Sequence, residues 1–367
     1  MTTKATDDRD DRYVLAVDLG TGGPKVGFVS LLGRVATQEH HEVETTFGPD
    51  GAATQDAEEW WRIIRTVATK QLASGAVDPK KVVAVSMTGQ WASTVPVDEA
   101  GTPVSPVIMW MDSRGGPLVR AAVGGPVSGY KPRGIAEFLR RSGGAPSLDG
   151  ADPVGHRLFL KQHQPDVWAR TRWLLEPVDY LSMCFTGKAA ASPVSMTGTW
   201  LVDTRSPSNV MYDPVLVELA GGAPEKLPPL QPFGTVMGVV RPEIAAELGI
   251  GDDVKVVTGA PDLHTAAIGA GAVRLGEAHM AVSTTGWISV PTTKKKTDII
   301  RSVATVLGLD ERTYLVANNH ETAGMCLQWF KGAMGGGLSY DELTALAADA
   351  APGSGNVIFT PWLKGER

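Results

Sequence analysis

A glycine-rich turn near the start of the chain carries side chains that could bind phosphate. The apolar run 13–19 leads into residues 18–25, DLGTGGPK. Backbone N–H groups in such a turn can donate to phosphate oxygens, Thr21 adds a hydroxyl, Lys25 adds a positive charge, and Asp18 offers an oxygen to a hydrated cation. The segment is neither a Walker A loop nor the dinucleotide fingerprint, because it lacks Gly-Lys-Ser/Thr and has a lysine at the third glycine position. Taken alone, it favours an ordinary hairpin with a surface lysine.

A second candidate is a carboxylate that directly follows a buried strand. Asp262 comes after the apolar run 254–257 and precedes the small-residue helical pattern 266–271. Ligands of α/β sheets bind beyond the carboxyl ends of strands, so Asp262 could act there as a general base. From these residues alone, the N-cap of the following helix is the better interpretation of Asp262.

Two further segments combine polar and aromatic side chains after apolar runs. They contain Gln90, Trp91, Trp110, Asp112 and Arg114. Such side chains could bind a polyol, with Trp110 packing against its carbon face. A core tryptophan beside a structural ion pair between Asp112 and Arg114 explains the second segment equally well.

Apolar patterning predicts the elements that would position these residues. Short apolar runs bounded by turns predict strands, and apolar residues three to four apart predict helices. The predicted strands are 13–19, 26–31, 82–85, 94–97, 107–110 and 254–257. One predicted helix begins near Gln55, and two others cover 134–141 and 166–185. Strands alternating with helices indicate a layered α/β fold.

One later segment repeats the pattern of the first turn. Residues 279–290 have the order strand, Gly/Thr turn, strand that is also found in residues 13–31. Two unrelated hairpins and two similar halves facing one ligand are equally compatible with the pattern.

Composition excludes several classes of protein. The 367 residues carry a net charge of −6, which excludes a domain-wide basic surface for nucleic acid. The two cysteines and seven histidines have no metal-ligand or disulfide spacing. The polar, acidic N-terminus is no signal peptide, and no apolar run is long enough to span a membrane. A cytoplasmic protein without nucleic-acid or membrane partners is expected.

The order of these segments resembles the FGGY family of carbohydrate kinases. The resemblance extends from residue 13 to residue 367 and includes five segments in the family's order: 18–25, 89–114, 227–242, 258–262 and 283–286. It implies the actin-like, hexokinase-type ATPase fold (ribonuclease H-like α/β), ATP and Mg²⁺ as cofactors, and a sugar or polyol as substrate. A homodimer is a further expectation.

The resemblance also implies a role for each candidate residue. Asp262 would be the catalytic base and contact the acceptor, and Asp18 would hold Mg²⁺ through water. The phosphates of ATP would contact Asp18, Gly20, Thr21, Gly22, Lys25, Ser283, Thr284, Thr285 and Gly286. The acceptor would contact Gln90, Trp91, Trp110, Asp112 and Arg114. ATP-dependent phosphorylation of a sugar or polyol hydroxyl follows, as in xylulose kinases. An impaired or regulatory nucleotide- or sugar-binding relative on the same fold is the alternative.

Some positions depart from the family pattern. Trp91 and Ala92 stand where xylulose kinases of the family have Met-His and glycerol kinases have Arg-Glu, and Leu263 follows the catalytic aspartate in place of Asn or Gln. Residues 361–367 resemble a segment inside the family's second domain. We therefore expect a sugar-binding domain at 1–271, a partial ATP-side domain at 272–367, and impaired ATP binding by this chain.

Overall fold

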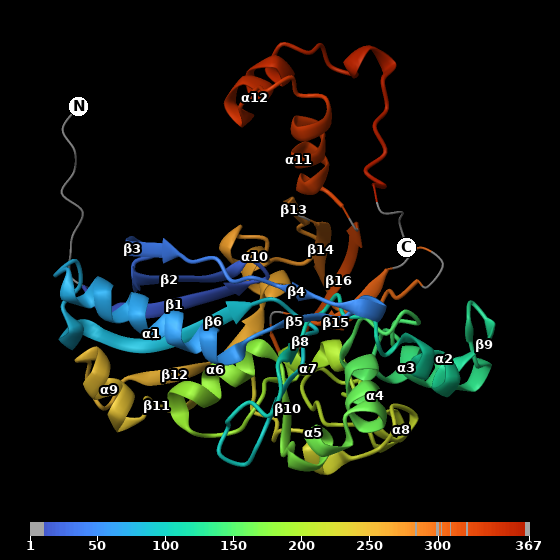
Figure 1. Cartoon of the computed structure of the whole chain (residues 1–367), viewed down its shortest axis with the longest axis horizontal. Helices are drawn as coiled ribbons and strands as arrows, with labels where there is room; N and C mark the ends of the chain where they lie inside the picture. The colour runs from blue at the N-terminus through green and yellow to red at the C-terminus, as the bar shows by residue number, and fades with distance from the viewer. Residues whose placement is uncertain are drawn as a thin grey trace.

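A six-stranded sheet forms the larger part of the protein in the computed structural model, which describes residues 11–282, 285–298, 301, 303–308, 310–320 and 322–363. Its strands lie in the order β11-β12-β6-β1-β2-β3 (Figure 1). Their bounds are β1 Tyr13–Gly20, β2 Gly23–Ser30, β3 Val35–His40, β6 Val82–Gly89, β11 Val236–Val239 and β12 Lys255–Pro261. β1, β6 and β12 run parallel, so their carboxyl ends share one edge of the sheet.

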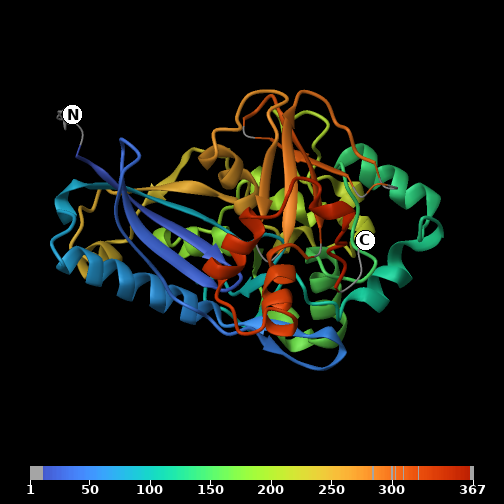
Figure 2. The same ribbon diagram turned by 90° about the horizontal axis from the view of Figure 1, so that it is seen from above.

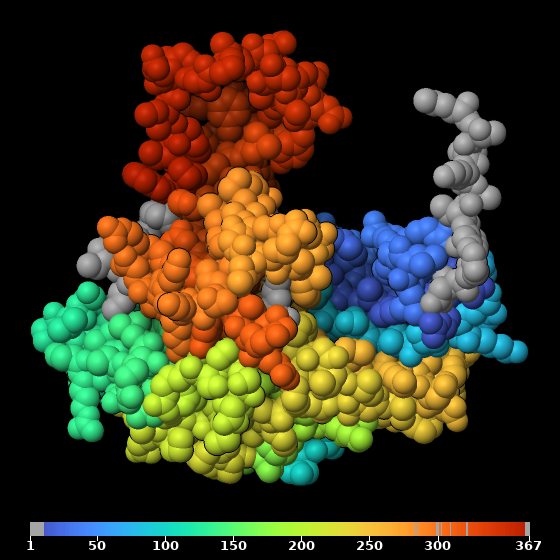
Figure 3. Space-filling model, turned by 180° about the vertical axis from the view of Figure 1, so that it is seen from behind, coloured from blue at the N-terminus to red at the C-terminus, as the bar shows by residue number. Residues whose placement is uncertain are grey.

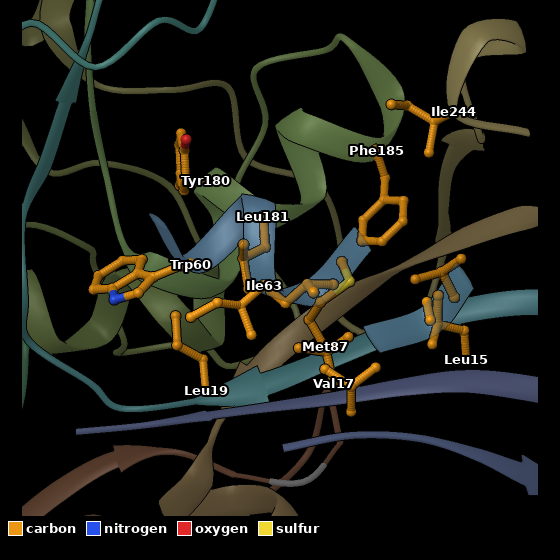
Figure 4. Packing of buried hydrophobic residues seen from close by; sticks show 14 of the residues in the cluster. Leu15, Val17, Leu19, Trp60, Ile63, Met87, Tyr180, Leu181, Phe185 and Ile244 are labelled. Carbon is orange, nitrogen blue, oxygen red and sulfur yellow. The ribbon is translucent and has the colours of Figure 1, made fainter. Parts of the chain in front are cut away.

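Apolar side chains from this sheet and from three helices form the main hydrophobic core. The helices are α1 (Ala57–Ala73), α6 (Pro177–Thr186) and α9 (Pro242–Leu248). The Asp56 side chain caps α1 by accepting from the Glu58 amide, and Trp60 on the inner face of α1 is completely buried. Figure 4 shows Trp60 and Phe185 over the strands that carry Leu19 and Met87. Burying apolar surface of this extent holds the parallel strands, and therefore their carboxyl ends, in place.

A mostly helical region inserted between β6 and β11 extends from this core. Its helices are α2 (Gly116–Val123), α3 (Pro132–Arg141), α4 (Pro153–His163), α5 (Pro165–Arg170), α7 (Pro193–Met196) and α8 (Pro214–Leu219). Its short strands are β7 (Val95–Val97), β8 (Val107–Ile108), β9 (Gly124–Val127) and β10 (Trp173–Leu175). β4 (Thr46–Phe47) and β5 (Ala53–Gln55), which precede α1, form a small sheet with β8. Single 3-10 turns lie at Pro49–Gly51, Pro79–Lys81, Thr197–Thr199, Pro224–Lys226 and Ser354–Asn356.

The helix predicted over 166–185 is wrong, because α5 and α6 are separated by β10. Trp173–Leu175 pairs with β7 in an antiparallel ladder. Pro177 starts α6, and a proline lacks the N–H that a continuous helix would need and disfavours helical backbone in the residue before it. Long-range strand pairing and one proline therefore divide an apolar pattern that suggests a single helix.

A second, four-stranded sheet begins after α10 (Asp262–Gly269). Its order is β13-β14-β16-β15, with β13 His279–Val282, β14 Gly286–Thr292, β15 Ala304–Leu307 and β16 Tyr314–His320. β13 and β14 form the predicted second hairpin. From above, the orange strands of this sheet lie between the blue strands of the first sheet and the green helices α2 and α3 (Figure 2).

The last two helices stand away from the rest of the protein. α11 (Gly324–Ala333) and α12 (Tyr340–Ala348) form the red region at the top of the space-filling view (Figure 3). Large apolar side chains on this region are exposed, among them Trp329, Phe330 and Phe359. Among the described residues, the helices are all too short or too polar to cross a bilayer.

Candidate active site

Three parallel strands bring the main candidate residues to one edge of the first sheet. Asp18 of β1 is in register with Thr88 of β6, and Thr88 is in register with Ala260 of β12. Gln90 and Asp262 follow directly after β6 and β12. At Gly89, a Cβ atom would lie 2.5 Å from the Leu19 carbonyl oxygen, so only glycine allows β1 and β6 to approach this closely.

The first glycine turn has a fixed backbone with one open side. Gly23 has a φ of +123°, and a Cβ atom there would lie 2.1 Å from the His41 carbonyl oxygen. Around Gly22, in contrast, a Cβ atom would meet nothing within 4 Å. Gln55 donates from Nε2 to the Thr21 carbonyl at 2.8 Å. The turn is therefore held from one side by the protein, and the described residues leave the Cβ side of Gly22 open.

Lys25 pairs with Asp18 across the hairpin rather than extending freely from the surface. The Lys25 Nζ and Asp18 Oδ2 atoms are 3.7 Å apart, and about half of each side chain is exposed. An exposed ion pair of this length contributes at most about 1 kcal/mol to stability. Both side chains therefore remain available to an anion and a cation at the turn.

Asp262 is the first residue of α10 and not its N-cap, so the capping interpretation is wrong. Pro261 occupies the N-cap position, and the Asp262 Oδ1 atom accepts from the Leu263 amide at 2.7 Å. Desolvation, with a smaller contribution from the negative charge of Asp18, raises the pKa of Asp262 to about 7. Such a carboxyl group can accept a proton near neutral pH far better than an ordinary aspartate.

Hydroxyl groups tie the start of α10 to the end of β6. Thr88 donates from Oγ1 to the Ala260 carbonyl at 2.9 Å, and the Thr88 and Thr265 hydroxyl oxygens are 2.6 Å apart. Asp262 is thereby fixed relative to the residues that follow β6.

Gln90 and Trp110 are joined by Ser93. The Ser93 hydroxyl donates to Gln90 Oε1 at 3.2 Å and accepts from the Trp110 amide at 2.9 Å. Trp110 in turn donates from Nε1 to the Thr21 hydroxyl at 3.0 Å, which links this segment to the first glycine turn. The Gln90 Nε2 atom is buried without a hydrogen-bond partner in the described part of the chain.

Trp91 is held by residues that the sequence did not single out. Its Nε1 atom donates to the Ser195 carbonyl at 2.6 Å, and its ring meets the His264 ring edge-on, with centroids 5.6 Å apart. The Ser195 hydroxyl donates to Asp179 Oδ2 at 2.6 Å. Burial raises the pKa of Asp179 to about 7. A charged residue, Asp179, in the mainly apolar segment 177–185 is the sequence signal that could have pointed to this support.

Asp112 and Arg114 form the structural ion pair that the sequence left open. Asp112 Oδ2 lies 2.7 Å from Arg114 Nη2 and also accepts from the Ala53 amide at 2.9 Å. The guanidinium carbon of Arg114 lies 4.2 Å from the Phe159 ring centroid. Because partners within the protein occupy both charges, direct contact of Asp112 or Arg114 with substrate stays a prediction.

The second phosphate motif lies only partly within the described residues. Ser283 and Thr284 lie outside them. Thr285 precedes β14, and Gly286 begins it, paired with Val282 of β13. No group of three or more acidic, histidine or cysteine side chains in the described ranges could enclose a metal ion.

Comparisons with known proteins agree with this architecture. The model of the FGGY carbohydrate kinase N-terminal domain matches residues 13–269. A xylulose kinase of Staphylococcus epidermidis is 27% identical over 355 residues, covering 96% of this chain and 68% of that protein. Among solved structures, ligand-bound xylulose kinase of Lactobacillus acidophilus has a TM-score of 0.84 at 22% identity, over 97% of this chain and 69% of that one. Gluconate kinase of the same organism has a TM-score of 0.83 at 22% identity, over 97% and 69% of the two chains. The expected fold is confirmed.

Proposed function

Because the chain belongs to the FGGY family of carbohydrate kinases, whose activity is ATP-dependent phosphorylation of a sugar, we propose that its acceptor is a neutral ketopentose such as xylulose. The observation that carries the proposed mechanism is the position of Asp262. Its carboxyl group, with a pKa near 7, lies at the sheet edge that also presents the glycine turn of β1 and β2. A base and a phosphate-binding turn side by side are what phosphoryl transfer to a hydroxyl requires.

Asp262 would accept the proton of the sugar hydroxyl as that oxygen attacks the γ-phosphorus of ATP. A free hydroxyl is a poor nucleophile, and removal of its proton during attack makes it a better one. With a pKa of about 7, about half of the Asp262 carboxyl groups are ionised and ready at neutral pH. The Leu263 amide, which donates to Oδ1, would hold the carboxylate in one orientation.

The first glycine turn would bind the phosphates. Gly20, Thr21 and Gly22 would donate hydrogen bonds, and Lys25 would supply positive charge. The Thr21 hydroxyl accepts from Trp110, so its own hydrogen remains free to donate. Ser283, Thr284, Thr285 and Gly286 would contribute from the second sheet. In this proposal residues 1–271 form the sugar-binding domain and 272–367 belong to the ATP side.

The surroundings of Asp18 fit magnesium. Mg²⁺ is commonly bound through one or two carboxylates together with substrate phosphates and water, rather than by an all-protein cage. Asp18 offers one half-exposed carboxylate beside the turn. The ion, when bound, would neutralise charge on the phosphates.

The charges near the acceptor segment favour a neutral sugar over gluconate. Gln90, Trp91 and Trp110 are uncharged, and the guanidinium of Arg114 is already paired with Asp112. A sugar acid would need an unpaired cation to offset the cost of desolvating its carboxylate. Gln90, through its unpartnered Nε2 atom, could donate to a neutral hydroxyl.

An ADP-release assay with D-xylulose, L-xylulose, gluconate and glycerol tests this proposal. We expect the highest kcat/KM for a xylulose enantiomer. Asp262→Asn keeps the shape of the side chain but removes the base, so kcat should fall by about 10²- to 10⁴-fold.

Asp166→Asn, the same chemical change at an exposed position of α5, is the matched control and should leave turnover unaltered. Unchanged turnover by Asp262→Asn would contradict the assigned base. A preference for gluconate would contradict the neutral acceptor. Sugar binding without any ADP release would instead support a binding or regulatory relative.

A further inference from the structure

His264 lies two residues after Asp262 and connects the two sheets. The side chain is completely buried. Its Nε2 atom is 2.9 Å from the carbonyl oxygen of Leu307, the last residue of β15. Since a carbonyl oxygen only accepts, the histidine must carry its hydrogen on Nε2. The first turn of α10 is thereby bonded to the second sheet.

The His264 ring also contacts Trp91, one of the residues proposed to line the acceptor site. The His264 ring meets the Trp91 ring at an interplanar angle of 80°. Trp91 is also fixed by its hydrogen bond to the Ser195 carbonyl, and a Cβ atom at Gly198 would lie 2.7 Å from its Nε1 atom. The indole therefore has little room to move independently of His264.

The Leu307 side chain adds an apolar contact between the second sheet and the elements around Asp262. It is buried in a small apolar cluster with Val194 of α7 and Ala260 of β12. β12 is the strand that leads into Asp262. The end of β15 thus contacts both the strand before Asp262 and the helix after it.

The second nitrogen of His264 argues against a role in packing alone. Nδ1 is buried and has no hydrogen-bond partner in the part of the chain that the structure describes. An unsatisfied buried acceptor is destabilising, and an aliphatic side chain at this position would avoid that cost. Burial also lowers the pKa of His264 to about 4, so the ring is neutral at neutral pH and cannot act as a cation toward phosphate.

We propose that His264 is a positioning residue that couples Trp91 and the Asp262 helix to β15, and so fixes the spacing between the acceptor and nucleotide sides of the site. This inference rests on the proposed kinase function. Phosphoryl transfer requires the acceptor oxygen and the γ-phosphorus in line, and a misplacement of about 1 Å can lower the rate by about 10²-fold. A residue that joins Trp91, the helix of Asp262 and the second sheet helps to set the distance between the acceptor oxygen and the γ-phosphorus.

Tyr314 provides a matched control, because its buried hydrogen bond also ties the second sheet to the rest of the protein but does not involve α10 or Trp91. Its hydroxyl donates to the Thr204 carbonyl at 2.8 Å, and the side chain is buried. This bond also joins the second sheet to the first part of the chain. Tyr314 of β16 is in register with Leu307 of β15, but its hydroxyl bonds to the segment after α7 and not to α10. Tyr314→Phe removes the bonding of this hydroxyl to the Thr204 and Arg205 carbonyls and changes none of the site residues.

The test compares His264→Leu, His264→Gln and Tyr314→Phe in the full chain. For His264→Leu we expect kcat to fall by about 10- to 100-fold, and a larger share of ATP to be hydrolysed without sugar phosphorylation. His264→Gln places an amide nitrogen near the position of Nε2 and should recover most of both losses. Tyr314→Phe should retain wild-type coupling at a similar midpoint of thermal unfolding.

Wild-type kcat and coupling in His264→Leu would overturn the inference. Equal losses in His264→Leu and Tyr314→Phe, in proportion to their thermal midpoints, would overturn it too. If the wild-type chain phosphorylates no sugar, the proposed function fails, and amide hydrogen exchange then decides the inference. Faster exchange in α10 and residues 90–93 for His264→Leu alone would support it, whereas equal exchange in all three variants would refute it.

Discussion

β1 and β2 lie inside the six-stranded sheet, whereas β13 and β14 form one side of the four-stranded sheet, with β13 at its edge. Leu15, Val17 and Leu19 of β1 are almost completely buried. Met280 and Val282 of β13 are 65% and 67% exposed. The same strand–turn–strand pattern therefore produces a covered hairpin and an uncovered one, because the pattern determines local pairing while distant elements determine burial.

The difference bears on how the two turns would bind phosphate. Around the first turn, α1, β3 and β6 hold the strands, and Gln55 and Trp110 contact Thr21. A turn fixed in this way loses little conformational entropy when a ligand binds. In β13, exposed apolar side chains alternate with partly buried ones, so burial stabilises this strand less than β1. Among the described strands, those of the first hairpin are therefore the more firmly held.

The largest effect that tests this comparison is a core truncation. Leu15→Ala in β1 should lower the free energy of unfolding by about 2–5 kcal/mol, since it removes a buried side chain and leaves a cavity. Met280→Ala in β13 should change it by less than about 0.5 kcal/mol. Guanidinium titration followed by circular dichroism measures both. Similar losses in the two variants would mean that β13 is covered as well as β1.

A smaller effect is expected at the turns themselves. Gly23→Ala would place a methyl group against the His41 carbonyl at a positive φ, and we expect destabilisation by about 2–4 kcal/mol. Gly286→Ala would meet the Ala323 Cβ atom at 3.1 Å and the Ala281 carbonyl oxygen at an ordinary 3.5 Å, and should cost no more than about 1 kcal/mol. The same titration distinguishes them, and a tolerated alanine at position 23 would show that the first turn can shift.

Local sequence patterns were sufficient to predict the three parallel strands that position the candidate site. Residues 13–19, 82–85 and 254–257 are short apolar runs that end in glycine or polar residues, and all three form parallel strands whose ends meet. The rule that ligands bind at such ends offers Asp262 as a candidate base, and the family resemblance adds Gln90 as an acceptor contact; both roles stay predictions.

Contacts between distant segments could not be predicted from the sequence. Trp91 is bonded to Ser195, about one hundred residues later, and His264 to Leu307. Neither partner lies at a helical or strand spacing from the residue that it contacts, so no periodicity reveals the pair. The same reason explains why 166–185 was predicted as one helix, since β10 exists only by pairing with β7.

The smallest predicted effect concerns the charge that the first hairpin places near Asp262. Burial is the larger cause of the raised pKa of Asp262, and the negative charge of Asp18 adds to it. Asp18→Asn removes that charge, so the pKa of Asp262 should fall from about 7 by less than about one unit. The second hairpin has no acidic residue between 279 and 292 and offers no equivalent charge.

NMR titration of ¹³C-labelled aspartate carboxyls measures the shift in the pKa of Asp262 without requiring turnover, with Asp166→Asn as the control. In the wild-type enzyme, activity should be lost as the pH falls through about 7, because protonation removes the base. An Asp262 pKa that stays the same or rises in Asp18→Asn would show that the first hairpin does not act on Asp262 through its charge.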